Sequence, residues 1–186
     1  LGIILQSISF MNMPTQLALP PIVLREISEE DALDVLHFES SNSTFFEKWV
    51  PARGPEHFEE MSLRQVISDL MVDPDRFYLV RSQSNELVGR INLRNLDKAP
   101  QGTAELGYRV GEKHLGKGYA KAAVLSIAAQ MRAEGTLTHL EAFAADNNPA
   151  SSNVLLACGF QLDKAGTKTV HHSGNPLTLP HFVLTL

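Results

Sequence analysis

The sequence is poor in the features that mark specialised protein classes. It has one cysteine, Cys158, among its 186 residues, so no disulfide can form within the chain. That usage suits a reducing compartment, and we expect the protein to be cytoplasmic. No apolar run approaches the ~20 residues that cross a bilayer, and the sequence shows no internal repeat or low-complexity tract. These absences exclude a disulfide-stapled scaffold, a membrane-spanning helix and a repeat architecture.

Excess positive charge is also lacking. Lysine and arginine number 16 against 21 acids, which gives a net charge of -5 and argues against nucleic acid as the main partner. The length fits one domain and is enough to bury roughly two thirds of the surface of the unfolded chain. A hydrophobic fraction of 44% is ordinary for a globular protein.

The first ten residues are apolar and uncharged, and Met11 and Met13 follow them. This run is too short to span a membrane and lacks the basic region and cleavage site of a signal peptide. We therefore interpret residues 1–20 as an N-terminal extension or a cloning remnant with little order, and residues 21–186 as the functional domain.

Hydrophobic periodicity and turn residues predict a mixed α/β domain (α+β in arrangement), with an antiparallel first half and strand–helix–strand units in its middle. A capping box at Ser28 and Asp31 and the pair Asn148-Pro149 mark two helix starts. The expected strands are residues 22–27, 77–81, 87–93, 103–110, 140–144, 160–168 and 181–186. The expected helices are residues 28–39, 56–72, 118–134 and 149–158, with an irregular stretch over residues 40–55.

The most informative segment joins the strand at 103–110 to the helix at 118–134 through Gly116-Lys117-Gly118. Glycines let a backbone approach an anion closely, and the free N–H groups of a helix start attract it. This combination predicts a pyrophosphate site. The segment matches neither a Walker A loop nor a dinucleotide fingerprint. An ordinary strand-to-helix turn is the alternative interpretation.

Leu115-Gly-Lys-Gly-Tyr-Ala120 resembles the acetyl-CoA-binding motif of the GNAT acetyltransferase superfamily, Gln/Arg-x-x-Gly-x-Gly/Ala. Leu115 departs from the motif, because it stands where the family usually has glutamine or arginine. The resemblance covers nearly the whole chain after residue 20. Its other segments are residues 46–51, 106–118, 148–151 and 154–160, whose order is similar to that of the ribosomal-protein N-terminal acetyltransferases. It implies a GNAT-like acyl-CoA N-acyltransferase fold, a central mixed sheet flanked by helices.

The resemblance also implies an N-acetyltransferase that uses acetyl-CoA as co-substrate, without a metal. The backbone from Leu115 to Ala120 would hold the pyrophosphate. The pantetheine amides would pair with the strand end at Arg109 and Val110, with a further hydrogen bond from Asn148. The cofactor-binding set is therefore Arg109, Val110, Leu115, Gly116, Lys117, Gly118, Tyr119, Ala120 and Asn148.

Two residues are catalytic candidates under this resemblance. Glu105 would serve as general base, directly or through water, and Ser151 would assist the departing thiolate. The alternatives are a solvent-facing strand glutamate and a helix-start serine that bonds its own backbone. The tyrosine that many GNAT enzymes use as acid is absent, since Leu155 stands at its position. Tyr108 is expected to pack or to line the cleft.

The remaining candidates carry no site. Cys158 is expected in the core. His171 and His172 are expected in an exposed loop, and they are too few to hold a metal.

The favoured function is acetyl transfer to a protein N-terminal α-amine. A small-molecule amine acetyltransferase acting on a polyamine, an amino acid or an amine antibiotic is one alternative, and a non-catalytic acyl-CoA-binding module is another. Acetyl-CoA and the amine acceptor are the expected partners, and the chain is expected to be a monomer or a homodimer.

Overall fold

The computed structural model describes residues 18–49, 54–97, 102–172 and 174–186. Its strands are β1 (Ile22–Glu26), β2 (Arg76–Ser82), β3 (Leu87–Arg94), β4 (Thr103–Val110), β5 (His139–Phe143), β6 (Gln161–His172) and β7 (Asn175–Thr185). Its helices are α1 (Ala32–Phe46), α2 (Glu60–Val72), α3 (Tyr119–Glu134) and α4 (Pro149–Ala157). Short 3-10 turns lie at Glu29–Asp31, Pro55–His57 and Glu112–His114. None of the described helices is both long and apolar enough to span a lipid bilayer.

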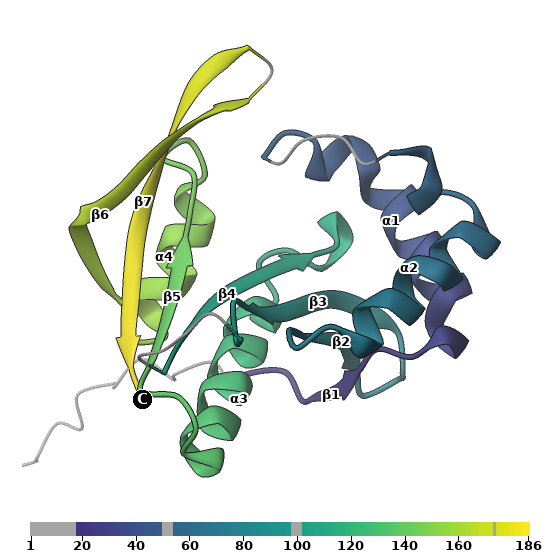
Figure 1. Cartoon of the computed structure of the whole chain (residues 1–186), viewed down its shortest axis with the longest axis horizontal. Helices are drawn as coiled ribbons and strands as arrows, with labels where there is room; N and C mark the ends of the chain where they lie inside the picture. Colours follow the sequence, from purple (N-terminus) through teal and green to yellow (C-terminus); the bar gives the residue numbers. More distant parts are fainter. Residues whose placement is uncertain (1–17, 50–53, 98–101, 173) are drawn as a thin grey trace, which may run out of the picture.

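The described strands form one seven-stranded sheet in the order β1-β2-β3-β4-β5-β7-β6. Strands β1 to β4 are antiparallel neighbours, β4 and β5 are parallel, and β7 lies between β5 and β6 with antiparallel pairing on both sides. Figure 1 shows α1 and α2 over one face of the first strands and α3 on the other face. The predicted mixed α/β class is confirmed.

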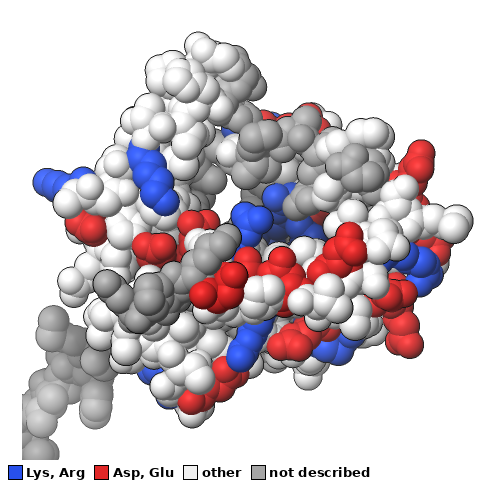
Figure 2. Space-filling view, in the orientation of Figure 1, with Lys and Arg blue, Asp and Glu red and all other residues white. Residues whose placement is uncertain are grey.

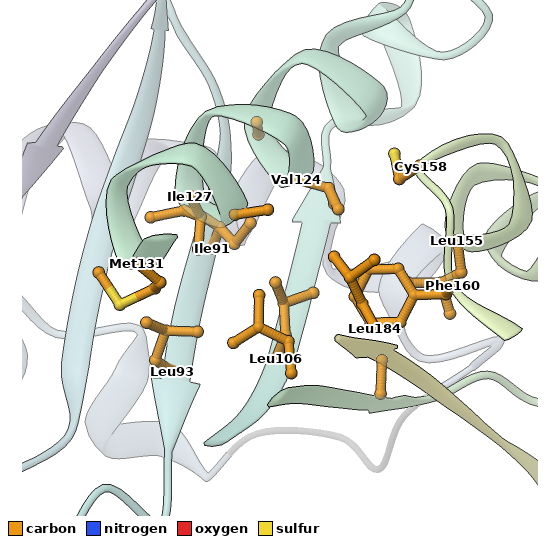
Figure 3. Packing of buried hydrophobic residues seen from close by; sticks show 14 of the residues in the cluster. Ile91, Leu93, Leu106, Val124, Ile127, Met131, Leu155, Cys158, Phe160 and Leu184 are labelled. Carbon is orange, nitrogen blue, oxygen red and sulfur yellow. The ribbon is translucent and has the colours of Figure 1, made fainter. Parts of the chain in front are cut away.

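The larger core lies between the sheet and helices α3 and α4. Figure 3 shows Val124, Ile127 and Met131 of α3 above Ile91 and Leu106 of the neighbouring strands. A smaller cluster on the other face packs α1 and α2 against β2. Strand side chains alternate between these two faces, so the same alternation that builds the core sends every second residue of β4 toward α1.

Two expectations about element boundaries are wrong. Helix α1 continues to Phe46 instead of ending at Glu39, because Phe38, Asn42 and Phe46 repeat every four residues and all three are buried. The serines and asparagines of this segment hid that period. The last hairpin pairs as far as His172 with Asn175, so His171 and His172 lie in strand β6 and not in a loop, and β7 begins at Asn175 instead of residue 181. By contrast, the capping box at Ser28 and the Asn148 cap are confirmed.

A buried charge network joins α1 to the middle of the sheet. Glu39 is 2% exposed, and its carboxylate lies 3.0 Å from Arg90 Nη2 of β3 and 3.0 Å from Arg109 Nη1 of β4. The Arg109 guanidinium also stacks on Phe46, 4.7 Å from the ring centroid. Removing one partner of such a network leaves the other charges buried without their counter-charge. Glu39 therefore holds α1 in a fixed position relative to β4.

We predict that Glu39→Gln lowers the free energy of unfolding by about 2 kcal/mol, because the two arginines lose a charged acceptor that both contact. Urea unfolding followed by circular dichroism measures this loss. Glu60→Gln is the matched control, since Glu60 pairs with Arg64 on the exposed surface of α2 and such pairs contribute about 0.5 kcal/mol. Equal losses in the two variants would contradict a special role for Glu39.

Candidate active site

A cleft opens where two parallel strands part. Strands β4 and β5 pair only from Thr103 to Glu105, and the last pair is Glu105 with Glu141. Beyond it β4 continues to Val110 beside β3, and β5 turns toward β7. The two strands diverge visibly in Figure 1. The parting leaves the β5-facing backbone groups of residues 106–110 without a strand partner, and such groups are ready to bind an extended ligand.

A cavity of about 470 Å³ lies against this opening. Its lining includes Glu105 and Tyr108 of β4, Phe143 of β5 and Ser151 of α4. Arginines of β3 and β4 line it as well, namely Arg90, Arg94 and Arg109. Figure 2 shows a hollow in the same part of the molecule, with basic side chains inside it and acidic ones along its lower edge. The cavity thus combines an apolar lining with charged side chains of both signs.

The predicted glycine loop lies at one end of α3. Gly116 and Gly118 both adopt left-handed backbone conformations, with φ of +71° and +83°, which residues with a Cβ adopt at a cost. Gly118 is the N-cap of α3, and the first turn of the helix contains no acid. The unpaired N–H groups of that turn are therefore available to an anion.

The surroundings of the two loop glycines differ. Nothing lies within 4 Å of the position that a Cβ on Gly116 would take, whereas one on Gly118 would stand 3.1 Å from Pro20. Lys117 is exposed. Behind the loop, His114 is buried and meets Tyr119 edge-on at 5.7 Å. Burial lowers the pKa of His114, and its Nε2 lies 3.6 Å from Glu86. The assignment of the loop to the phosphates of a ligand stays a prediction.

Glu105 stands where the strands part, half-buried at the cleft wall. Its side chain makes no hydrogen bond or ion pair with another described residue, so its carboxylate is available to a ligand or water. Glu141, its partner in the parallel ladder, is instead bound by another side chain. The Glu141 carboxylate lies 3.0 Å from Nε2 of His181, whose Nδ1 lies 3.1 Å from Asp163. This group ties β5, β7 and β6 together and fixes the hairpin wall of the cleft.

Ser151 lies in the first turn of α4, on the other side of β4. Its backbone N–H donates to the Asn148 side-chain oxygen at 3.3 Å, which is the helix cap, and a hydrogen bond from Asn148 to the pantetheine arm stays a prediction. The Ser151 hydroxyl lies 3.0 Å from the Tyr108 hydroxyl. Ser151 is therefore fastened at its backbone by the cap and at its side chain by β4.

The other predicted site residues fall into two groups. Leu115, Lys117, Tyr119 and Ala120 lie around the glycine loop. Arg109 and Val110 lie on the unpaired part of β4, so their backbone groups can reach the cleft. The Arg109 side chain, however, is turned to α1 by Glu39. These assignments as ligand contacts stay predictions.

Three side-chain contacts around the cleft could not be predicted from the sequence. Glu39 looked like any helical acid, and only the tertiary structure sets it between two arginines. His181 and its carboxylates come from three strands that are distant in sequence. Tyr108 was expected to line the cleft, which is correct, but its contact with Ser151 carries no local signal. The expectation that Cys158 lies in the core is confirmed, because Cys158 is buried and its pKa is raised to about 11 by that burial.

Among the described residues, no group of three or more potential ligand side chains could hold a metal ion.

Comparison with known proteins agrees with this geometry. Residues 22–161 match the family described as Acetyltransferase (GNAT) domain. The chain is 26% identical over 158 residues to a probable N-acetyltransferase, YjcK, of Bacillus subtilis, covering 82% of this chain and 87% of that protein. Its fold is similar to the ribosomal-protein-S5-alanine acetyltransferase of Vibrio fischeri, with a TM-score of 0.81, 20% identity and coverage of 88% and 92%.

A second solved structure with the same fold is the spermidine N-acetyltransferase of Vibrio cholerae, crystallised with coenzyme A and spermine. The TM-score is 0.74 at 16% identity, and the match covers 88% of this chain and 95% of that one. The two neighbours act on different amines by name, so the shared fold does not choose the acceptor.

Two glycines near opposite ends of α3 allow a prediction about ligand binding and its matched control. Gly116 and Gly135 share a left-handed φ, of +71° and +66°, and each has open space where a Cβ would go. Gly116→Ala and Gly135→Ala should therefore cost a similar ~1 kcal/mol of stability. We predict that only Gly116→Ala weakens coenzyme A binding, by about tenfold, because its methyl group stands where the phosphates approach. Isothermal titration calorimetry measures the affinities, and an equal effect in both variants would refute the placement.

Proposed function

The chain belongs to the GNAT acetyltransferase family, and we propose that it acetylates protein N-terminal α-amines with acetyl-CoA as the donor. The family supplies the reaction class, which is direct transfer of an acetyl group from a thioester to an amine. The acceptor and the residue roles are our proposal. A cytoplasmic location, the monomer-or-homodimer state and the separation of residues 1–20 from the domain stay predictions.

The observation that carries the proposal is the position of Glu105 at the parting of β4 and β5. A thioester is attacked by a neutral amine, so the ammonium form must first lose a proton. Glu105 faces the cleft at the last paired position of both strands. Its carboxylate can accept this proton directly or through one water, next to the segment of β4 whose backbone groups are unpaired.

The acceptor is limited by what a modest base can deprotonate. At pH 7, making an α-amine neutral costs roughly 1 kcal/mol, whereas a lysine-type amine costs roughly 4–5 kcal/mol. A single half-exposed carboxylate suits the first task better. The named activity of the Vibrio fischeri neighbour, ribosomal-protein-S5-alanine acetylation, supports the same choice.

A small-molecule amine is the second candidate. Glu105 and Glu141 are partners at the end of the β4–β5 ladder, and negative charge at a cleft favours a cationic ligand. The named activity of the Vibrio cholerae neighbour on spermidine is consistent with this reading. A non-catalytic acyl-CoA-binding role is disfavoured by the open access of the Glu105 carboxylate to the cleft.

The acceptor is tested by measuring coenzyme A release with a panel of amines. Peptides that begin with Ala or Ser should be acetylated, and the same peptides with a blocked N-terminus should not. Spermidine and an aminoglycoside serve as competing acceptors. We expect kcat/KM for the free peptides to exceed that for spermidine at least tenfold. Activity confined to spermidine would overturn the acceptor and leave the reaction class intact.

The base is tested by Glu105→Gln, which should slow turnover by about 100-fold at pH 7, the low end for general-base catalysis. Part of that loss should return between pH 7 and pH 9, because the α-amine is then already neutral. The measurement is the pH–rate profile of both proteins with an Ala-starting peptide. Glu30→Gln, which removes an exposed carboxylate outside the lining of the cavity, should behave like the parent. A Glu105→Gln variant as fast as the parent at every pH would remove Glu105 from the mechanism.

A further inference from the structure

The Tyr108 hydroxyl meets the start of α4 in a contact that the proposed roles do not use. It lies 3.2 Å from the Ser151 carbonyl oxygen and 3.0 Å from Ser151 Oγ. Tyr108 of β4 and Ser151 of α4 are 43 residues apart in the sequence, and both line the cavity. Their hydroxyl groups join α4 to the unpaired part of β4.

Tyr108 is poorly suited to donate its proton outright. Burial raises the pKa of Tyr108 to about 12, whereas a free thiol has a pKa near 8.5. Proton transfer from this phenol to a thiolate would run uphill by more than three pH units. A hydrogen bond that keeps its proton has no such penalty, so Tyr108 can orient another group but is a weak acid itself.

We propose that Tyr108 is a positioning residue that aims the Ser151 hydroxyl at the sulfur of the departing coenzyme A. The inference deepens the proposed function and rests on its reaction class, though not on the identity of the acceptor. Two hydrogen-bond arrangements are open to the pair. In one, Tyr108 donates to the Ser151 carbonyl oxygen and Ser151 Oγ donates to the phenol. In the other, Tyr108 donates to Ser151 Oγ, which leaves the serine proton free to point into the cleft.

Developing charge on sulfur selects the second arrangement. The amine nitrogen bonds to the carbonyl carbon, the carbon–sulfur bond breaks, and its electron pair goes to sulfur. Ser151 then donates a hydrogen bond to that sulfur while Tyr108 donates to Ser151, and each bond strengthens the other. Both hydroxyls keep their protons. Counted from its ammonium form, the acceptor gives up two protons in becoming an amide: the first goes to Glu105 and then to water before the attack, and the second goes to the sulfur to form the thiol.

A double-mutant cycle tests the coupling in turnover. Tyr108→Phe should lower kcat about fivefold with little change in the KM for acetyl-CoA. The same change should have no further effect in a Ser151→Ala background, and its effect should return in Ser151→Thr, which restores a hydroxyl. Ser152→Ala, the next residue of the same helix turn, is the control and should match the parent. Additive losses from Tyr108→Phe and Ser151→Ala would overturn the inference.

A second readout needs no acceptor. Coenzyme A bound to the protein is titrated from pH 6.5 to 9.5 by thiolate absorbance near 240 nm, with the protein alone subtracted. Cys158, with its pKa near 11, stays silent in this range. The bound thiol should titrate at lower pH in the parent than in Tyr108→Phe or Ser151→Ala, because both variants lose stabilisation of the thiolate. Identical titrations would overturn the inference, and this outcome is separate from the failure of any amine to be acetylated.

Discussion

The parting of β4 from β5 is the constraint on which the rest of the site depends. A continuous sheet would satisfy the backbone of β4 on both sides and leave no room for a ligand. Here the parallel ladder stops after Glu105 and Glu141, and β5 finds its partner in β7. Unpaired backbone groups are costly when buried and dry. The free stretch of β4 is therefore stable only at a wet or ligand-filled cleft, which is where it lies.

Strand β4 carries candidate site residues on both of its faces. Successive side chains of β4 point to opposite faces, so Glu105 faces the α1 side and Tyr108 faces α4. The proposed proton acceptor and the Tyr108–Ser151 hydroxyl pair are thus separated by the thickness of the strand. A thioester held along β4 would meet the amine from one side and the hydroxyl pair from the other.

Two groups of polar and charged side chains hold the walls of the cleft at fixed positions. On one side, Glu39 binds α1 to β3 and β4 through Arg90 and Arg109. On the other, His181 lies between Glu141 and Asp163 and stacks on Phe143 at 4.8 Å. The pKa of Asp163 is lowered chiefly by the hydrogen bond from His181. Both groups draw partners from three separate elements, so each resists relative movement of those elements.

The sequence by itself determined the class of the fold, most of the element boundaries and the glycine loop, because periodicity, caps and positive-φ glycines act over a few neighbouring residues. It also placed Glu105 and Ser151 as candidates through family resemblance. It misplaced the end of α1, where polar residues hide the buried repeat of Phe38, Asn42 and Phe46. Only the tertiary structure decided that β4 and β5 part after Glu105, that Glu39 is buried between two arginines and His181 between two carboxylates, and that Tyr108 meets Ser151. Each of these depends on strands and helices that are far apart in the chain, and no local pattern records which distant residues will become neighbours.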